Sequence, residues 1–246
     1  MSRKTINNKH LTLAVFTDFD GTITKKDLGD EIFKVYGEFE PYNSRIKNDE
    51  MGIHEYWNVL CDKLRPGVTR ETIVEFARAQ ETDTNFPAFV NFCEENNIPV
   101  SVISDGFDVY IHEVLGNLNL GHLPLYCNQL IFEGNNNPKP VFPRATESCT
   151  CKCASCKRNS MLANLPPDTV IVYIGDGFSD FCAAEHADII FAKKELAAHC
   201  NEHKIPHYPW QNFFDVTRIM KNILRDGKYK IRNQAEMNRK RAFETE

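Results

Sequence analysis

Apolar and polar positions follow two alternating patterns along most of the chain. Short runs rich in β-branched residues predict strands over Leu11–Thr17, Pro99–Ile103, Thr169–Ile174 and Asp188–Phe191. Apolar residues at helical spacing predict helices between and after them, around Phe86–Cys93, Val109–Leu115, Ser179–His186 and Trp210–Leu224. Strands that alternate with helices indicate a parallel sheet covered on both faces. We therefore expect a three-layer α/β fold of the Rossmann-like kind.

Residues 25–82 interrupt this alternation. Their apolar positions recur at helical spacing, for example at Tyr56, Trp57 and Leu60, and no strand pattern appears among them. We expect a helical cap here, inserted into a core domain formed by residues 11–24 and 83–224. Residues 125–156 form a second, irregular insert that begins like a strand and ends rich in cysteine. Residues 225–246 form a charged tail, and their composition favours a solvated helix or a frayed end.

Length, charge and composition narrow the class of protein. The 246 residues, of which 42% are hydrophobic, suit one core with an inserted subdomain. The net charge is −5 and the core region has no long basic run, so we do not expect a nucleic-acid partner. The first ten residues are polar, and no apolar stretch approaches the ~20 residues that span a bilayer. We expect a cytoplasmic protein without a membrane partner, either a monomer or a homodimer.

Polar side chains gather where three of the predicted strands end. Asp18–Thr22 follow the first strand, Ser104–Gly106 the second, and Gly175–Asp180 the third. Lys157 opens the helix before the third strand. Because ligands of open parallel sheets bind at the carboxyl ends of the strands, we expect these groups to share one site.

The residue types at these strand ends match what phosphoryl transfer requires. Carboxylates from Asp18 and Asp176 offer the oxygen ligands that Mg²⁺ prefers, and the cation offsets the charge of a phosphate ester. The second oxygen of Asp18 can then attack phosphorus as the nucleophile. Asp20, two residues on, can protonate the departing oxygen and later deprotonate water. A small phosphomonoester is the expected substrate.

Other groups of the same segments are expected to bind phosphate. Ser104 offers a hydroxyl donor and Lys157 a cation to the phosphate oxygens. Asp180 either holds a metal-bound water or orients Lys157. Tight turns at the glycines let backbone N–H groups face an anion. The expected phosphate-binding set is Gly21, Thr22, Ser104, Asp105, Gly106 and Lys157.

Four motifs in this order resemble those of the haloacid dehalogenase superfamily of phosphatases. They are DFDGT at residues 18–22, VISDG at 102–106, Lys157, and YIGDGFSD at 173–180, and the resemblance spans residues 11–224. It implies the same roles, with Asp18 as nucleophile, Asp20 as acid and base, and Asp176 and Asp180 at the metal. It also implies that the backbone carbonyl of Asp20 binds the metal. The helical insert resembles the cap of the phosphoserine-phosphatase type.

A closer resemblance is to the methionine-salvage phosphatases that act on 2-hydroxy-3-keto-5-methylthiopentenyl-1-phosphate. Tyr126-Cys127-Asn128 and the cysteine-rich run into Cys156-Lys157 carry it. The sequence departs from that pattern at Asp105 and Arg158, which we place at the rim of the site. Phosphoserine or a phospho-amino-alcohol therefore remains an alternative substrate. A non-catalytic regulatory or metal-binding protein of the same fold is an alternative of another class, and the complete set of catalytic residues argues against it.

The cap offers acidic residues for substrate recognition. Asp27 and Glu31 lie at the start of its first expected helix. Cap residues at this distance from the nucleophile resemble the specificity residues of the family, which implies that they recognise an amine or hydroxyl on the leaving group. Negative charge near a helix N-terminus also complements the helix dipole, which is the alternative explanation.

Four cysteines crowd into eight residues, in the pattern Cys149-x-Cys151-x-Cys153-x-x-Cys156. Four thiolates suit tetrahedral Zn²⁺, although one-residue spacers strain the closure of the site. A disulfide or unligated thiols are the alternatives. Because Cys156 directly precedes Lys157, we hypothesise that metal loading or oxidation shifts the lysine.

Overall fold

The computed structural model describes residues 11–134, 137–149, 151, 153–163, 165–166, 168–227 and 229–244. A seven-stranded sheet in the order β4-β3-β2-β1-β5-β6-β7 forms its centre. All neighbouring strands are parallel except β3 and β4, which are antiparallel. The strands are β1 (Thr12–Thr17), β2 (Val100–Phe107), β3 (Leu125–Ile131), β4 (Lys139–Val141), β5 (Thr169–Gly175), β6 (Ile189–Ala192) and β7 (Tyr208–Pro209).

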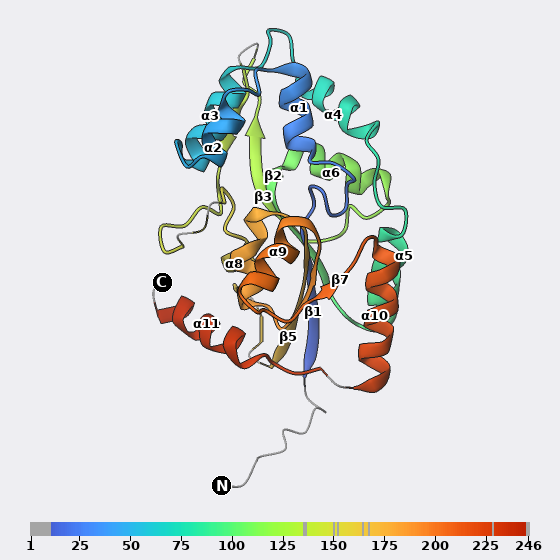
Figure 1. Ribbon diagram of the computed structural model, residues 1–246. Helices are drawn as coiled ribbons and strands as arrows, with labels where there is room; N and C mark the ends of the chain where they lie inside the picture. The colour runs from blue at the N-terminus through green and yellow to red at the C-terminus, as the bar shows by residue number, and fades with distance from the viewer. Residues whose placement is uncertain are drawn as a thin grey trace.

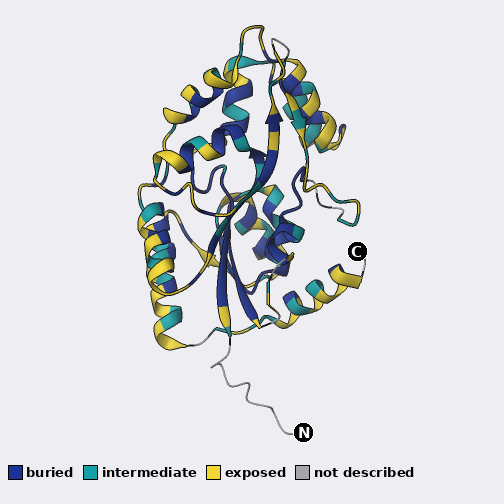
Figure 2. Ribbon diagram, turned by 180° about the vertical axis from the view of Figure 1, so that it is seen from behind, coloured by how far each residue is buried: buried dark blue, intermediate teal, exposed yellow. Residues whose placement is uncertain are grey.

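Two layers of helices cover the sheet (Figures 1 and 2). Side chains alternate along β1, so that Leu13 and Val15 join one apolar cluster while Ala14 and Phe16 join the other. The first cluster includes α5 (Phe86–Glu95), α6 (Asp108–Asn117) and α10 (Phe213–Asp226). The second includes α7 (Lys157–Leu162), α8 (Phe181–His186) and α9 (Lys194–Glu202). Burial on both faces explains the nearly continuous apolar runs of the central strands, and the expected α/β fold class is confirmed.

Four helices lie beyond the carboxyl ends of the central strands, at the top of Figure 1. The carboxylate of Asp27 accepts a hydrogen bond from the N–H of Asp30 and so starts the first of them. A bridge between Thr24 and Thr82 joins the two segments through which the chain leaves and re-enters the core. We propose that residues 25–82 act as a cap over the site. The four helices are α1 (Leu28–Tyr36), α2 (Tyr42–Lys47), α3 (Ile53–Asp62) and α4 (Arg70–Arg78).

The second insert is only partly irregular. Residues 125–131 form β3, which confirms the strand expected at the start of this segment. The strand pairs in parallel with β2 and belongs to the main sheet, so its assignment to an irregular insert is wrong. A short apolar run has the same pattern in a core strand and in an insert, and only its pairing distinguishes them. β2 also extends to Phe107, so Ser104–Gly106 lie inside the strand, at a shift in register against β3.

The C-terminal tail is a helix, α11 (Asn233–Glu244), but it is docked rather than solvated. The Arg239 guanidinium contacts the buried Asp188 carboxylate at 3.1 Å and also donates to the carbonyl of His186. Arg232 donates to backbone carbonyls at the end of α8, including that of Ala187. Charged composition predicted exposure here, whereas arginine can bury its stem while its charge is paired.

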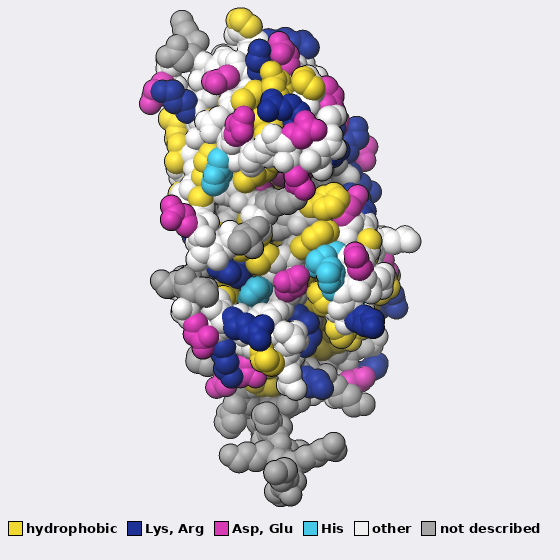
Figure 3. Space-filling model, turned by 60° about the vertical axis from the view of Figure 1, so that its left-hand side comes forward, with side chains coloured by type: hydrophobic (Ala, Val, Ile, Leu, Met, Phe, Trp, Pro, Cys, Tyr) yellow, Lys and Arg dark blue, Asp and Glu magenta, His cyan; other side chains and the backbone are white. Residues whose placement is uncertain are grey.

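The surface carries both signs of charge. On the face shown in Figure 3, basic and acidic side chains are interspersed around hydrophobic ones. Of the helices in the described part of the chain, none has both the length and the apolar composition to cross a bilayer.

Candidate active site

A cavity of about 420 Å³ opens between the carboxyl ends of the central strands and the cap helices. The core and the cap each contribute side chains to its lining. The expected catalytic and metal-binding residues of the core thus come together. All of them line the cavity except Asp180, which contacts Lys157 just behind the lining. From the core, the lining includes Asp18, Asp20, Gly21, Ser104, Asp105, Gly106, Lys157 and Asp176, and from the cap Asp27, Asp30, Ile53 and Trp57.

Lys157 joins two of the carboxylates. Its Nζ lies 2.5 Å from Asp18 Oδ1 and 2.6 Å from Asp180 Oδ1, and its side chain is 2% exposed. Burial opposes the charge of Lys157, but the Asp18 and Asp180 carboxylates raise its pKa well above the ordinary value. Burial, together with Asp180, raises the pKa of Asp18. The lysine is therefore a fixed cation beside the residue expected to be the nucleophile.

The carboxylate of Asp180 is saturated with hydrogen bonds. Oδ1 accepts from Lys157 and from the hydroxyl of Tyr173, each at 2.6 Å. Oδ2 accepts from the backbone N–H groups of Asp176 and Gly177, at 2.8 and 3.0 Å. These four bonds fill the acceptor sites of a carboxylate. Of the two roles expected for Asp180, the contacts favour orienting Lys157 over direct or water-mediated contact with a metal.

Asp176 is held from two sides. Thr22 Oγ1 donates to its Oδ1 at 3.1 Å, and Lys194 Nζ lies 2.7 Å from its Oδ2. Thr22 was expected to bind phosphate, but it is 1% exposed and does not line the cavity, because its hydroxyl is directed at Asp176. The loop after β1 thus positions a carboxylate.

Gly21 also differs from its expected role. Its N–H donates to Thr24 Oγ1 and to the carbonyl of Lys26, so this group stabilises the turn instead of facing a phosphate. Its φ of +72° lies in the left-handed region, and a Cβ here would overlap Asp176 Oδ2. Glycine is required because the backbone passes directly against this carboxylate.

Asp20 is oriented by two donors. The N–H of Leu28 reaches its Oδ1 at 2.8 Å, and the Tyr110 hydroxyl reaches its Oδ2 at 3.1 Å. Burial raises the pKa of Asp20 well above the ordinary value, and the nearby Asp27 carboxylate raises it further. The raised pKa favours the protonated carboxyl, which can donate a proton to a leaving oxygen.

The residues of the segment Ser104–Gly106 have different roles. Ser104 Oγ accepts from the N–H of Gly106 at 3.0 Å, so its own hydrogen remains available to a ligand in the cavity. Asp105 was expected to bind phosphate, but its Oδ1 accepts from the N–H of Ser155 at 2.6 Å. Burial raises the pKa of Asp105 to about 6. The hydrogen bond shows that this carboxylate anchors the cysteine-rich segment. In its ionised form it would repel a phosphate rather than bind one.

The cap contributes a slightly different pair of carboxylates from the one expected. Asp27 and Asp30 line the cavity, whereas Glu31 does not. Glu31 instead pairs with Lys34 at 3.0 Å on the outer side of the helix. Arg158, expected at the rim, lines a separate cavity beside the cysteines.

A family model described as haloacid dehalogenase-like hydrolase matches residues 15–185. The chain belongs to this family. It is 30% identical over 214 residues to the 2-hydroxy-3-keto-5-methylthiopentenyl-1-phosphate phosphatase of Brevibacillus brevis, covering 86% of this chain and 96% of that protein. Identity to the protein of the same name from Bacillus mycoides is 31% over 217 residues, covering 87% and 98%.

Solved structures agree on the fold. A phosphoserine phosphatase, solved as a phospho-aspartyl intermediate analogue, matches with a TM-score of 0.64 at 18% identity, covering 87% of this chain and 99% of that one. The family and the curated relatives identify the chain as an enzyme, a haloacid dehalogenase-type phosphatase.

The phosphatase presents a donor set that fits Mg²⁺. Carboxylate oxygens of Asp18, Asp176 and Asp180 all lie within 4.8 Å of one another, and all three residues are buried. Burial raises the pKa of Asp18 and of Asp176, so their ionised forms need a further positive charge. Mg²⁺ is a hard cation that prefers such oxygens. Since Asp180 is saturated, Asp18 and Asp176 are the side chains that would hold it.

Two site residues of the phosphatase went unnoticed in the sequence. Lys194 follows the end of β6, so the rule that drew attention to the other strand ends would also have found it. Tyr110 lies inside a helical apolar pattern and reads as a core residue, and no sequence signal marks its contact with Asp20.

Proposed function

We propose that this phosphatase hydrolyses a small phosphomonoester in a Mg²⁺-dependent reaction through a phosphate ester on Asp18. One observation carries the proposal: the carboxylates of Asp18 and Asp176 meet beside the buried Lys157 ammonium in a cavity under the cap. The ammonium and a bound cation together provide the positive charge that an anionic nucleophile needs when it approaches a phosphate.

The reaction divides into two steps. In the first, an oxygen of Asp18 forms a bond to phosphorus while the bond to the substrate oxygen breaks. Asp20 gives its proton to that leaving oxygen. In the second step Asp20 takes a proton from water, which attacks phosphorus and releases inorganic phosphate and free Asp18. When bound, Mg²⁺ would neutralise charge on the phosphoryl oxygens.

The remaining groups position the Asp20 carboxyl and stabilise charge on the phosphoryl oxygens. Lys157 and the Ser104 hydroxyl offer donors to the phosphoryl oxygens, in a cavity that both line. Tyr110 and the N–H of Leu28 fix the carboxyl of Asp20 for proton transfer. Closure of the cap over the site would exclude bulk water from the ester intermediate.

The lining of the cavity supports a substrate whose leaving group carries no anionic charge. The cap supplies Asp27, Asp30, Ile53 and Trp57, and no lysine or arginine of the described cap residues lines the cavity. Phosphoserine would place its carboxylate near these acids. A neutral leaving group with hydroxyl, keto and apolar parts suits them better, because the two acids offer hydrogen bonds and Ile53 and Trp57 offer an apolar surface.

The substrate we propose is therefore of the methionine-salvage type, 2-hydroxy-3-keto-5-methylthiopentenyl-1-phosphate, which the names of the curated relatives also support. Its thioether end would pack on Trp57. Burial raises the pKa of Asp27 to about 7, so this carboxyl can donate a hydrogen bond to a keto or hydroxyl oxygen.

A phospho-amino-alcohol is the second candidate, because two carboxylates in the cap also suit an ammonium group. Asp27→Asn separates the two candidates. The variant should keep most of its kcat/KM toward a neutral leaving group and lose at least tenfold toward phosphoethanolamine. Both effects are measured by assaying the wild type and the variant with 2-hydroxy-3-keto-5-methylthiopentenyl-1-phosphate, phosphoethanolamine and phosphoserine.

Asp18→Asn tests the chemistry itself. The variant should lose turnover of a generic aryl phosphate while its thermal unfolding stays close to that of the wild type. Asp27→Asn, another acid of the same cavity, serves as the control and should retain aryl phosphate hydrolysis. Turnover by Asp18→Asn within tenfold of the wild type would overturn the assignment of the nucleophile.

A further inference from the structure

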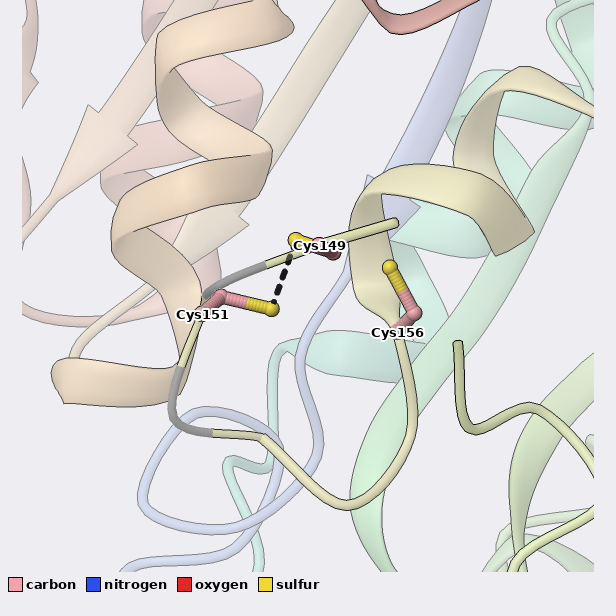
Figure 4. A group of neighbouring side chains, drawn as sticks. All are labelled: Cys149, Cys151 and Cys156. Atoms are coloured by element: carbon pink, nitrogen blue, oxygen red, sulfur yellow. Dashed lines mark hydrogen bonds between the residues drawn. The ribbon is translucent and has the colours of Figure 1, made fainter. Parts of the chain in front are cut away.

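Five thiols converge beside the active site. Cys149 Sγ lies 2.9 Å from Cys151 Sγ and 3.6 Å from Cys182 Sγ, and Cys151 Sγ lies 2.8 Å from Cys153 Sγ. The sulfurs of Cys149, Cys151 and Cys156 all lie within 4.8 Å of one another, and Figure 4 shows them pointing toward a common space. The sequence pattern contained four of these residues, and the fold adds Cys182 from α8.

A disulfide does not account for this arrangement. One sulfur can join only one other, yet Cys151 Sγ contacts the sulfurs of both Cys149 and Cys153, and Cys149 Sγ also contacts that of Cys182. Thiols are weak donors and weak acceptors, so hydrogen bonds among them stabilise such a cluster little. A single cation that binds several sulfurs at once explains why they gather around one point.

Geometry selects four of the five sulfurs. Zn²⁺ takes four thiolates at about 2.3 Å in a tetrahedron, which places neighbouring sulfurs about 3.8 Å apart. Cys149 and Cys182, 3.6 Å apart, already have nearly this separation. Three ligands spaced by single residues, at Cys149, Cys151 and Cys153, would strain the chain around one ion. A ligand from α8 removes that strain, because it approaches from a separate element.

We propose that Cys149, Cys151, Cys156 and Cys182 bind one Zn²⁺ ion as a tetrahedral tetrathiolate site. This set replaces Cys153 of the sequence pattern with Cys182. Each thiol releases its proton to solvent as the zinc–sulfur bond forms.

The surroundings fit a charged metal site. A cavity of about 530 Å³, lined by Cys149, Cys151, Cys182 and Arg158, adjoins the cluster and gives an ion access. The tetrathiolate would carry a net negative charge, and the buried Arg158 guanidinium lies beside it. Cations next to thiolates favour the deprotonated form that a metal needs.

Such a site would fasten two active-site residues. Cys156 directly precedes Lys157 at the start of α7, and Cys182 follows Asp180 by two residues at the start of α8. Lys157 and Asp180 contact each other at 2.6 Å. One ion that bridges both helix starts would therefore hold this contact in place, as a positioning site and not as part of the reaction.

Metal content tests the proposal on the whole, reduced chain. The protein, loaded with Zn²⁺ and freed of excess ion, should retain one zinc per chain by elemental analysis. Cobalt(II) in place of zinc should give the visible absorption of a tetrahedral thiolate complex. Cys151→Ser and Cys182→Ser should each lower retained zinc at least tenfold, whereas Cys153→Ser and the control Cys127→Ser, on β3, should retain it.

A second measurement uses only the wild-type protein, so its result does not depend on whether the cysteine variants fold. Alkylation of native wild-type protein, read peptide by peptide, should show Cys149, Cys151, Cys156 and Cys182 protected by zinc and reactive after chelation. Zinc content below one-tenth per chain in the wild type would overturn the site. Loss of zinc from Cys153→Ser with retention in Cys182→Ser would overturn the ligand set.

Discussion

Gly21→Ala probes a position where the backbone passes close to the Asp176 carboxylate in the active site. An alanine Cβ at this position would overlap Asp176 Oδ2 and lie 3.2 Å from both Asp176 Cγ and Lys194 Nζ. The carboxylate must therefore move, and the backbone must hold a φ of +72° with a side chain present. The strain of the left-handed conformation costs about 1–2 kcal/mol.

The effect on catalysis should exceed the effect on stability. A displacement of about 1 Å in a group that positions the reaction costs on the order of 100-fold in rate. We expect kcat/KM for an aryl phosphate to fall about 100-fold and the Mg²⁺ concentration for half-maximal activity to rise, because Asp176 is a proposed ligand. The free energy of unfolding should fall by about 1–2 kcal/mol, measured by urea denaturation.

Gly67→Ala is the matched control. Gly67 has a φ of +89°, and apart from Gly67 and its two chain neighbours no atom of the described chain lies within 4 Å of the position its Cβ would take. The same backbone strain is present there without the contact, so stability should fall by a similar amount while kcat/KM stays within about threefold of the wild type. Gly21→Ala with wild-type kinetics, or equal losses of activity in both variants, would refute the reasoning.

Three further predictions follow from single contacts. Tyr110→Phe removes the 3.1 Å hydrogen bond to Asp20, and we expect kcat to fall by about 2- to 10-fold with KM within threefold, since a hydrogen bond between neutral groups is worth about 0.5–1.5 kcal/mol; an unchanged kcat would contradict a positioning role. Because burial raises the pKa of Asp105 from 3.8 to about 6, folding favours its protonated form, and its contribution to stability is lost as the pH rises through 6. Asp105→Asn should therefore gain about 1 kcal/mol on the wild type between pH 5 and pH 7.5 in urea denaturation, and a difference that does not vary with pH would contradict the shift. Arg239→Met removes the cation that pairs with the buried Asp188 carboxylate, and it should lower the free energy of unfolding by about 3 kcal/mol. Lys240→Met, on the exposed side of the same helix, is the control and should be nearly neutral. Equal effects of the two substitutions in calorimetry would disprove the docking of α11.

The sequence alone determined the fold class and most of the core residues that line the candidate active site. Asp18, Ser104 and Asp176 belong to segments whose apolar runs are recognisable as buried strands. The carboxyl ends of parallel strands share one edge of a sheet, so side chains at those ends meet whatever the details of packing. Lys157, at the start of a helix beside that edge, followed from the motif order.

Only the tertiary structure decided what many of these side chains contact. Thr22 and Asp105 appear in the motifs as phosphate binders, but they hold Asp176 and the cysteine segment. Asp180 turned out to have every acceptor site filled, with Lys157 and Tyr173 on one oxygen. The partner of each group comes from a distant part of the chain, and local periodicity carries no information about such pairings.

The same limit applies to the cysteines and to the C-terminal helix. The sequence pattern contained four thiols, and only the packing of α8 brought Cys182 to them. The charged composition of α11 predicted that this helix is exposed to solvent. Its docking on the core is favourable only because Arg239 pairs with the buried Asp188 carboxylate. A sequence records which face of each element is apolar, since that depends on neighbours three or four residues away. Polar contacts depend on donors and acceptors that meet only when the elements are packed, so the fold alone decides them.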